Sequence, residues 1–169
     1  ARASAMLASR GRLVKPTLLL RQENPLTGET QEVSVDALPE TTALAIDEED
    51  IELVIRSMTA VMHGRRGTAR ASGRRSAYRM AGKTGTAQVV SIPQGSEYDA
   101  KSLRETQRDH ALFIAFAPVD HPKIAIAVVV ENGGSGAAVA APIARKVMDY
   151  FFLNRLRRAA LTGTSGVFG

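Results

Sequence analysis

Apolar positions repeat with helical spacing in two long stretches of the chain. From Asp47 to Gly64 they recur every three or four residues, after an acidic opening and before a glycine. Acidic groups stabilise the amino end of a helix, and glycine is common where a helix stops. This predicts a helix with the buried stripe Ile51, Val54, Ile55, Met58, Val61 and Met62. The period in 137–158 predicts a second helix that covers a sheet face, with Pro142 tolerated only in its first turns.

Continuous apolar runs predict strands elsewhere. Leu112–Ala117 and Ile124–Val130 flank a turn between Pro118 and Pro122, and both are apolar on their two faces, so we expect central strands covered on each side. Residues 79–90 also have strand-like composition. Residues 1–10 suggest the end of a helix that stops at Gly11, and turn residues near position 26 suggest a hairpin. The polar stretches 65–76 and 91–108 are expected to be loops.

Composition limits the choices further. The 169 residues suit one domain, and no apolar run approaches the length of about 20 residues that spans a bilayer. The absence of cysteine excludes disulfides and Cys-ligated zinc. The net charge is +5, and eight basic residues with no acidic one lie between Leu53 and Ser96. Such a cluster attracts nucleic acid, anionic lipid or a substrate carboxylate, or it is simply a solvated surface.

The segment "AGKTGTAQ" holds a Gly-Lys-Thr that resembles part of a phosphate-binding loop. That loop requires a glycine five residues before Gly82, where this chain has Ala77. It also requires a helix afterwards, whereas β-branched residues and a proline follow Thr86. Both spacing and context therefore argue against a phosphate loop.

The same residues suit the binding of a carboxylate beside an acyl group. On a strand, Thr84 and Thr86 point to one side, where two hydroxyls can bind a carboxylate near the charge of Lys83. Gly85 has no side chain to obstruct a ligand along the strand, and the backbone N–H of Thr86 can donate to an oxyanion. The competing interpretation is a strand of small residues packed against a helix.

Other chemistries find less support in the sequence. A catalytic triad is not indicated, because the sequence has no Gly-x-Ser-x-Gly nucleophile elbow to pair with a histidine. The spacing of acidic residues relative to His63, His110 and His121 does not suggest a zinc site either. We expect these histidines to be surface or capping residues. Nucleic-acid binding usually adds stacking aromatics to basic groups, and only Tyr78 lies within the basic cluster, so we expect no nucleic-acid partner.

The motif Lys83-Thr84-Gly85 resembles the third motif of the penicillin-binding proteins and serine β-lactamases. The succession "GTARAS", "AGKTGTAQ", a polar loop, "RDHALFIAFAPVDHPKIAIAVVVENGG" and a closing helix is similar to class B penicillin-binding proteins, above all the penicillin-binding protein 2 group of Gram-negative bacteria. "ARASAMLASRGRLVKP" resembles the helix and strand after the second motif. The resemblance covers residues 1–154, the carboxyl-terminal part of a transpeptidase domain, and leaves 155–169 as a tail.

The chain departs from this family at two motifs. No serine is followed three residues later by lysine, and none is followed two residues later by asparagine. The nucleophile and middle motifs are therefore absent. We expect the chain to be part of a split or longer domain and to be inactive alone.

The resemblance implies an α/β (α+β) fold with a central antiparallel sheet sandwiched by helices. It implies a peptidoglycan D,D-transpeptidase that cross-links stem peptides through an acyl-serine, is acylated by β-lactams and uses no cofactor or metal. Lys83 and the Thr86 N–H would serve catalysis, and Thr84, Gly85 and Thr86 would bind substrate. The implied partners are the remaining amino-terminal part of the domain and a membrane glycan polymerase. The implied location is the periplasmic face of the inner membrane. A serine β-lactamase or D,D-carboxypeptidase of the same fold, and a non-catalytic anion- or nucleic-acid-binding module, remain alternatives.

Overall fold

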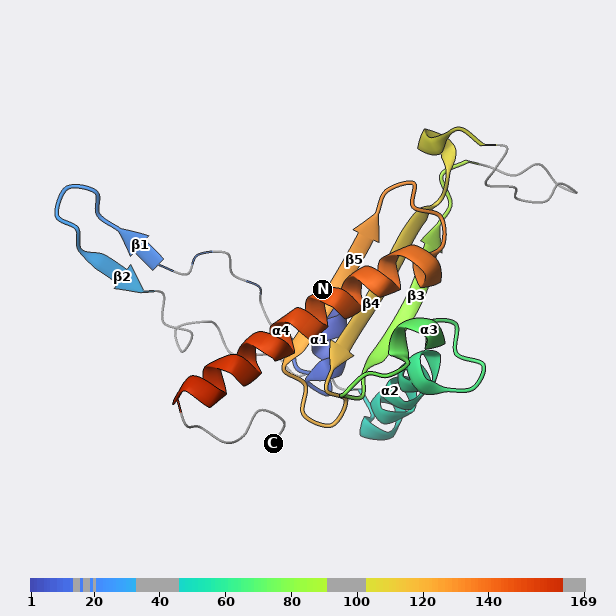
Figure 1. Ribbon diagram of the computed structural model, residues 1–169, viewed down its shortest axis with the longest axis horizontal. Helices are drawn as coiled ribbons and strands as arrows, with labels where there is room; N and C mark the ends of the chain where they lie inside the picture. The colour runs from blue at the N-terminus through green and yellow to red at the C-terminus, as the bar shows by residue number, and fades with distance from the viewer. Residues whose placement is uncertain (14–15, 17–18, 20, 33–45, 91–102, 163–169) are drawn as a thin grey trace, which may run out of the picture.

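The computed structural model describes residues 1–13, 16, 19, 21–32, 46–90 and 103–162. A three-stranded antiparallel sheet forms its centre, in the order β3-β4-β5. Its strands are β3 (Ala81–Ala87), β4 (His110–Ala117) and β5 (Ile124–Val130). The separate hairpin of β1 (Arg21–Glu23) and β2 (Thr30–Glu32) extends away from this sheet in Figure 1.

Helices cover both faces of the central sheet (Figure 1). The helix α4 (Ala141–Thr162) crosses one face, and the short helix α1 (Arg2–Ala8) lies on the other. The Ser4 hydroxyl of α1 donates to the Ala115 carbonyl at 2.9 Å. The helix α2 (Glu48–His63) and the single turn α3 (Arg70–Gly73) lie beside β3. The sheet is thus sandwiched between helices as expected, and none of the described helices is long and apolar enough to cross a membrane.

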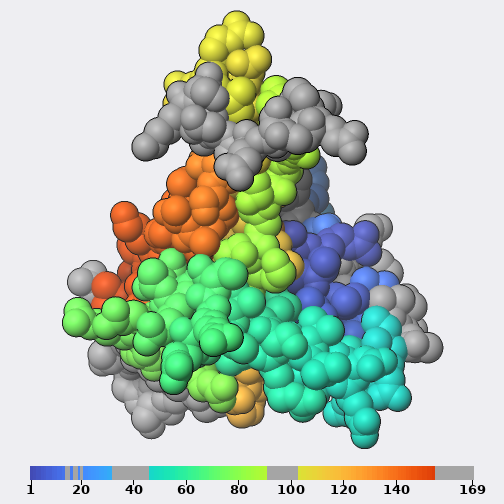
Figure 2. All heavy atoms as spheres, turned by 90° about the vertical axis from the view of Figure 1, so that its right-hand side faces the viewer, coloured from blue at the N-terminus to red at the C-terminus, as the bar shows by residue number. Residues whose placement is uncertain are grey.

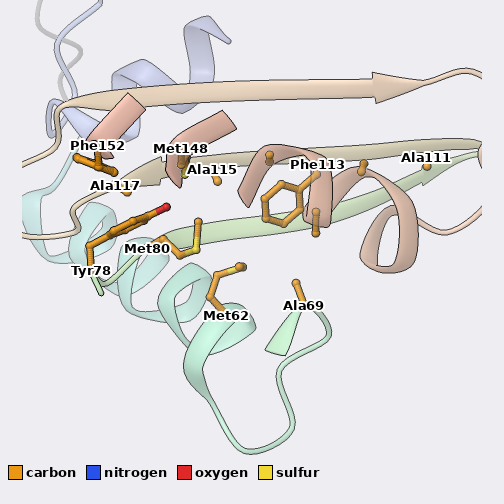
Figure 3. Packing of buried hydrophobic residues seen from close by; sticks show 13 residues of the cluster. Met62, Ala69, Tyr78, Met80, Ala111, Phe113, Ala115, Ala117, Met148 and Phe152 are labelled. Atoms are coloured by element: carbon orange, nitrogen blue, oxygen red, sulfur yellow. The ribbon is translucent and has the colours of Figure 1, made fainter. Parts of the chain in front are cut away.

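The core between α4 and the sheet combines small and large side chains (Figure 3). β4 presents three buried alanines to α4, and α4 with its preceding turn presents three more: Ala111, Ala115, Ala117, Ala140, Ala141 and Ala144. Larger side chains fill the space between them: Met62, Met80, Phe113, Met148 and Phe152. Small residues allow the helix to lie close to the strands, while the methionines adapt to the remaining space.

A π-helical turn, η3 (Gly136–Ala140), leads into α4, and the sequence did not predict it. A methyl group added at Gly136 would lie 2.3 Å from the Leu112 carbonyl oxygen and 2.4 Å from that of Gly85. These are backbone atoms of two paired strands and cannot easily move aside. Gly136 is therefore required for the close contact between this turn and the sheet at Gly85.

The helix predicted after Asp47 is confirmed, with Asp47 as its N-cap and Gly64 as its C-cap. One member of the predicted stripe is wrong: Val54 is 43% exposed. Thr59 is buried instead, with its hydroxyl bonded to the Ile55 carbonyl inside the helix. The apolar period alone could not show that the hydroxyl of a polar side chain would form a hydrogen bond within the helix and so allow that side chain to be buried.

Three further expectations need correction. The predicted loop 65–76 contains the helical turn α3, which has no apolar period to reveal it. For the described chain, the expectation that β5 is covered on both faces is also wrong, because Val129 on one of these faces is 61% exposed. The closing helix extends to Thr162, so part of the predicted tail 155–169 continues α4. The remainder of that tail, 163–169, and residues 91–102 of the predicted loop lie outside the described residues.

Candidate functional site

The candidate site residues lie on β3, at the outer edge of the central sheet. In Figure 2 this strand is visible as a ridge between α1 on one side and the start of α4 on the other, with α2 and α3 below it. Lys83 and Thr86 are exposed, whereas Thr84 and Gly85 are partly buried. A strand in this position leaves alternate backbone groups available to a ligand.

Two hydrogen bonds identify which residues of β3 direct their backbone groups outward. The Met80 N–H donates to Nε2 of His63 at 3.1 Å, and the Thr84 carbonyl accepts from Nζ of Lys83 at 2.6 Å. Residues two apart on an antiparallel strand direct their N–H and C=O groups to the same edge. The N–H of Thr86 therefore points to the outer edge, where an oxyanion donor would have to lie.

The side chains of Thr84 and Thr86 share one face of the strand, as predicted. Their cross-strand partners are Phe113 and Ala111, which both face α4. The Thr84 hydroxyl lies 3.3 Å from the hydroxyl of Thr68, which precedes α3. Thr68 was missed as a site residue in the sequence analysis, although it belongs to the quoted segment "GTARAS".

Lys83 lies on the opposite face of β3 from the threonines, because side chains alternate along a strand. Its ammonium group nevertheless reaches the outer edge, where it donates to the Thr84 carbonyl. The positive charge therefore lies at the same edge as the N–H of Thr86.

Gly85 is confined from both sides of the sheet. A methyl group at this position would lie 3.2 Å from Cβ of Leu112, a tight contact, and the Gly136 turn covers the other face. The glycine thus serves the packing of the strand, and its expected role in ligand access stays a prediction. The competing interpretation of small residues packed on a helix applies more strongly to Gly82, where a methyl group would lie 2.6 Å from the Phe113 ring.

Two of the three histidines have structural partners, as expected. Burial, followed by the nearby charge of Arg79, lowers the pKa of His63, whose Nε2 accepts the Met80 N–H. Nδ1 of His110 accepts from the Asn132 N–H at 2.9 Å. Among the described residues, no group of three His, Cys, Asp or Glu side chains is arranged to hold a metal ion.

A network centred on Arg145 of α4 holds the segment after Thr68. Its guanidinium donates to the Ser72 carbonyl at 2.8 Å and to that of Arg74 at 3.3 Å, and it pairs with Asp149 at 2.7 Å. Asp149 also accepts from the Tyr78 hydroxyl at 2.7 Å. Burial, with this hydrogen bond, raises the pKa of Tyr78, so the phenol stays protonated. The loop beside β3 is therefore attached to α4 by charge-assisted hydrogen bonds.

Comparison with known proteins places this geometry in context. The family described as penicillin binding protein transpeptidase domain matches residues 1–149. The chain is 36% identical over 154 residues to the peptidoglycan D,D-transpeptidase MrdA of Salmonella typhimurium, an alignment that covers 89% of this chain and 24% of the relative. It is similar to the crystal structure of Pseudomonas aeruginosa PBP2 in complex with WCK 5153, with a TM-score of 0.64, 39% identity and coverage of 89% and 28% of the two chains.

A third similar structure is penicillin-binding protein A from M. tuberculosis as an imipenem acyl-enzyme complex. The TM-score is 0.61 and the identity 26%, over 88% of this chain and 28% of the other. The chain therefore spans about a quarter of the length of the relatives to which it is similar.

Proposed function

This chain belongs to the penicillin-binding protein transpeptidase domain family, and from that membership we propose that it forms the carboxyl-terminal part of a peptidoglycan D,D-transpeptidase. The predicted resemblance to penicillin-binding protein 2 and the predicted fold class are both confirmed. The relatives are named as peptidoglycan D,D-transpeptidases. That a protein containing this chain has the same activity is our proposal.

The observation that supports the proposal is the free edge of β3, where Lys83, Thr84 and Thr86 meet. A serine outside this chain would attack the D-Ala-D-Ala bond, form an acyl-serine ester and release D-Ala. An amine of a neighbouring stem peptide would then attack the ester, displace the serine oxygen and complete the cross-link. Water in place of that amine would give the hydrolysis that a carboxypeptidase or β-lactamase performs.

The residues of this chain would contribute binding and electrostatic stabilisation. The hydroxyls of Thr84 and Thr86 would bind the terminal carboxylate of the stem peptide or of a β-lactam, within the positive field of Lys83. The Thr86 N–H would donate to the oxyanion of the tetrahedral intermediate, an interaction whose loss typically costs about 3–4 kcal/mol. The ammonium of Lys83 would also help to relay protons to the middle motif, which this chain lacks.

The remaining part of the domain would also complete the packing of this chain. The outer side of α4 exposes four large apolar residues: Ile143, Val147, Tyr150 and Leu153. Together with the edge of β5, which pairs with no further strand among the described residues, this surface would be covered by the amino-terminal part of the domain. We further propose, from family membership, a location at the periplasmic face of the inner membrane beside a glycan polymerase.

Intact-mass spectrometry after incubation with penicillin tests the proposal. This chain alone should gain no mass, whereas a complete transpeptidase domain that carries it should gain one penicilloyl group on a serine outside it. A persistent adduct that an amine acceptor removes faster than water supports transfer, and rapid loss to water supports a β-lactamase. A stoichiometric adduct on this chain alone, or none on the complete domain, would refute the assignment.

Substituting Thr86 in the complete domain tests its proposed role. Thr86→Ala removes the hydroxyl but keeps the N–H. Acylation by a β-lactam that bears the carboxylate should therefore fall about 10- to 150-fold, corresponding to about 1.5–3 kcal/mol. An acylating agent without a carboxylate should lose much less. Equal losses for the two agents would show that Thr86 supports the strand instead.

A further inference from the structure

Six exposed arginines lie in the segment between α2 and β3, and they are here called the arginine surface: Arg65, Arg66, Arg70, Arg74, Arg75 and Arg79. The ion pairs found among the described residues are Arg10–Glu52 and Arg145–Asp149, so no arginine of this surface has an acidic partner there. Figure 2 shows the segments that carry it, between α2 and β3, on the same side of the molecule as the outer edge of β3.

The backbone beneath the arginine surface is held in place. A methyl group at Gly67 would lie 2.3 Å from the Val61 carbonyl oxygen, so this turn lies directly against the end of α2. The Ala69 N–H donates to the same carbonyl at 3.1 Å. On the other side, Arg145 binds the carbonyls of Ser72 and Arg74. Because the carbonyls turn inward, the charged side chains project outward from a fixed scaffold.

A side-chain contact joins the segment that carries the arginine surface to β3. Thr68 lies between Arg66 and Arg70 in the sequence, and its hydroxyl contacts that of Thr84 on β3. Lys83 adds its charge at the same edge. A ligand whose carboxylate reached Thr84 would therefore have its neighbouring groups close to the arginines.

The surface lacks the apolar and stacking side chains that favour a lipid interface or single-stranded nucleic acid as its ligand. Tyr78, the one aromatic residue of residues 64–79, is only 8% exposed, and its ring packs 4.4 Å from that of Phe152. No large apolar side chain between Gly64 and Arg79 is exposed. Apolar side chains that insert strengthen binding in a lipid interface beyond the attraction of charge, and binding to single-stranded nucleic acid usually adds aromatic rings for stacking.

We propose that the arginine surface binds the acidic stem peptides of peptidoglycan strands and concentrates them at the outer edge of β3. The proposal rests on the function proposed above and adds the region that recognises the polymer. Stem peptides carry several carboxylates along an extended chain, and a fixed array of guanidinium groups offers them paired hydrogen bonds as well as charge. An electrostatic surface of this kind raises the local concentration of its ligand by about 10- to 1,000-fold at low ionic strength.

The test uses a complete transpeptidase domain that carries this chain, and soluble uncross-linked glycan strands with intact stem peptides as the probe. In one variant, Arg65, Arg66 and Arg70 are changed to Gln. In the matched control, the exposed Arg2, Arg12 and Arg21 are changed to Gln, which alters the net charge equally. Thermal unfolding of each variant shows that it is folded. Binding is measured at about 0.02 M and about 0.5 M salt.

We expect the first variant to bind the strands about tenfold more weakly than the wild type at low salt and almost equally at high salt. The control should bind like the wild type, and strands whose carboxylates have been amidated should bind the wild type as weakly as the variant binds intact strands. Equal losses in both variants would overturn the proposal, as would equal binding of amidated and intact strands. Phosphatidylglycerol vesicles or single-stranded DNA that compete through the same three arginines would also overturn it.

The outcome for this inference is distinguishable from that for the proposed function. If the wild-type domain forms a penicilloyl adduct but the variant at Arg65, Arg66 and Arg70 binds the strands as well as the wild type does, the transpeptidase assignment is supported. The same result refutes the arginine surface as the site that binds the polymer. Absence of any adduct on the wild-type domain refutes both.

Discussion

Replacing Arg145 by glutamine should loosen the loop that carries Thr68 without disturbing the helix around it. The guanidinium connects α4 to the Ser72 carbonyl at 2.8 Å, and its side chain is only 18% exposed. Glutamine is a good helix former but is too short to keep these contacts. The change therefore tests whether the attachment to α4 holds the loop against β3.

The magnitude follows from the partners that are lost. The pair with Asp149 joins residues four apart on one helix, and the Asp149 side chain is 46% exposed, so this contact stabilises by only about 0.3–0.5 kcal/mol. The charged hydrogen bond to the carbonyl of buried Ser72 contributes more, about 1.5 kcal/mol, while the contact of 3.3 Å to Arg74 adds little. The total expected loss is about 2 kcal/mol.

Urea unfolding of the complete domain measures this loss, with Lys146→Gln as the control. Lys146 is the exposed neighbour of Arg145 on α4, and its replacement removes the same charge and should change stability by less than about 0.5 kcal/mol. Limited trypsin digestion gives a second readout, because the loop is rich in arginine and cleavage should accelerate when it opens. If Arg145→Gln is as stable and as resistant to trypsin as Lys146→Gln, the network does not hold the loop.

Three further predictions concern single positions. His63→Gln should flatten the dependence of stability on pH. Burial lowers the folded pKa of His63, so the contribution of His63 to stability is complete above the unfolded pKa of about 6.5 and is lost as the pH falls from there through the folded pKa. Identical stabilities of both proteins in urea unfolding from pH 5 to 8 would contradict this. Gly136→Ala should lower stability by about 1–3 kcal/mol in thermal or urea unfolding, since the new methyl group meets strand backbone, and an unchanged melting temperature would show that the turn can retreat. Tyr78→Phe should lower the free energy of unfolding by about 1 kcal/mol through the lost hydrogen bond to Asp149. It should also remove the decline in stability above pH 10 that the raised pKa of this phenol predicts, because only the unfolded chain ionises there.

Much of the fold could be predicted because local pattern and tertiary packing agree. The helix after Asp47 has both of its caps in the sequence, and the two runs around Pro118 are long enough to specify their strands. The errors arise where packing is decided by distant parts of the chain. Val54 has the right spacing for the core but no partner, and the turn after Gly136 depends on carbonyls of two strands that no local pattern reveals.

The candidate site was only partly accessible from sequence. The alternation of a strand was enough to place Thr84 and Thr86 on one face, and the Lys-Thr-Gly motif selected the strand. Thr68 and Arg145 could not be found in this way, because they reach β3 from another loop and another helix. Their roles depend on side-chain contacts across 16 and 73 residues of sequence, which only the folded chain defines.

The alanine-lined contact between α4 and β4 has a consequence for how such a protein would react with β-lactams. Only glycine is smaller than alanine, and glycine weakens helices and strands alike, so most substitutions there add volume and push α4 away from the sheet. Lifting α4 would move Arg145, and with it the loop that contacts Thr84. Under the function proposed above, substitutions at Ala115 or Ala144 would change acylation by β-lactams, although both side chains are buried between α4 and the sheet and neither lies at the outer edge of β3.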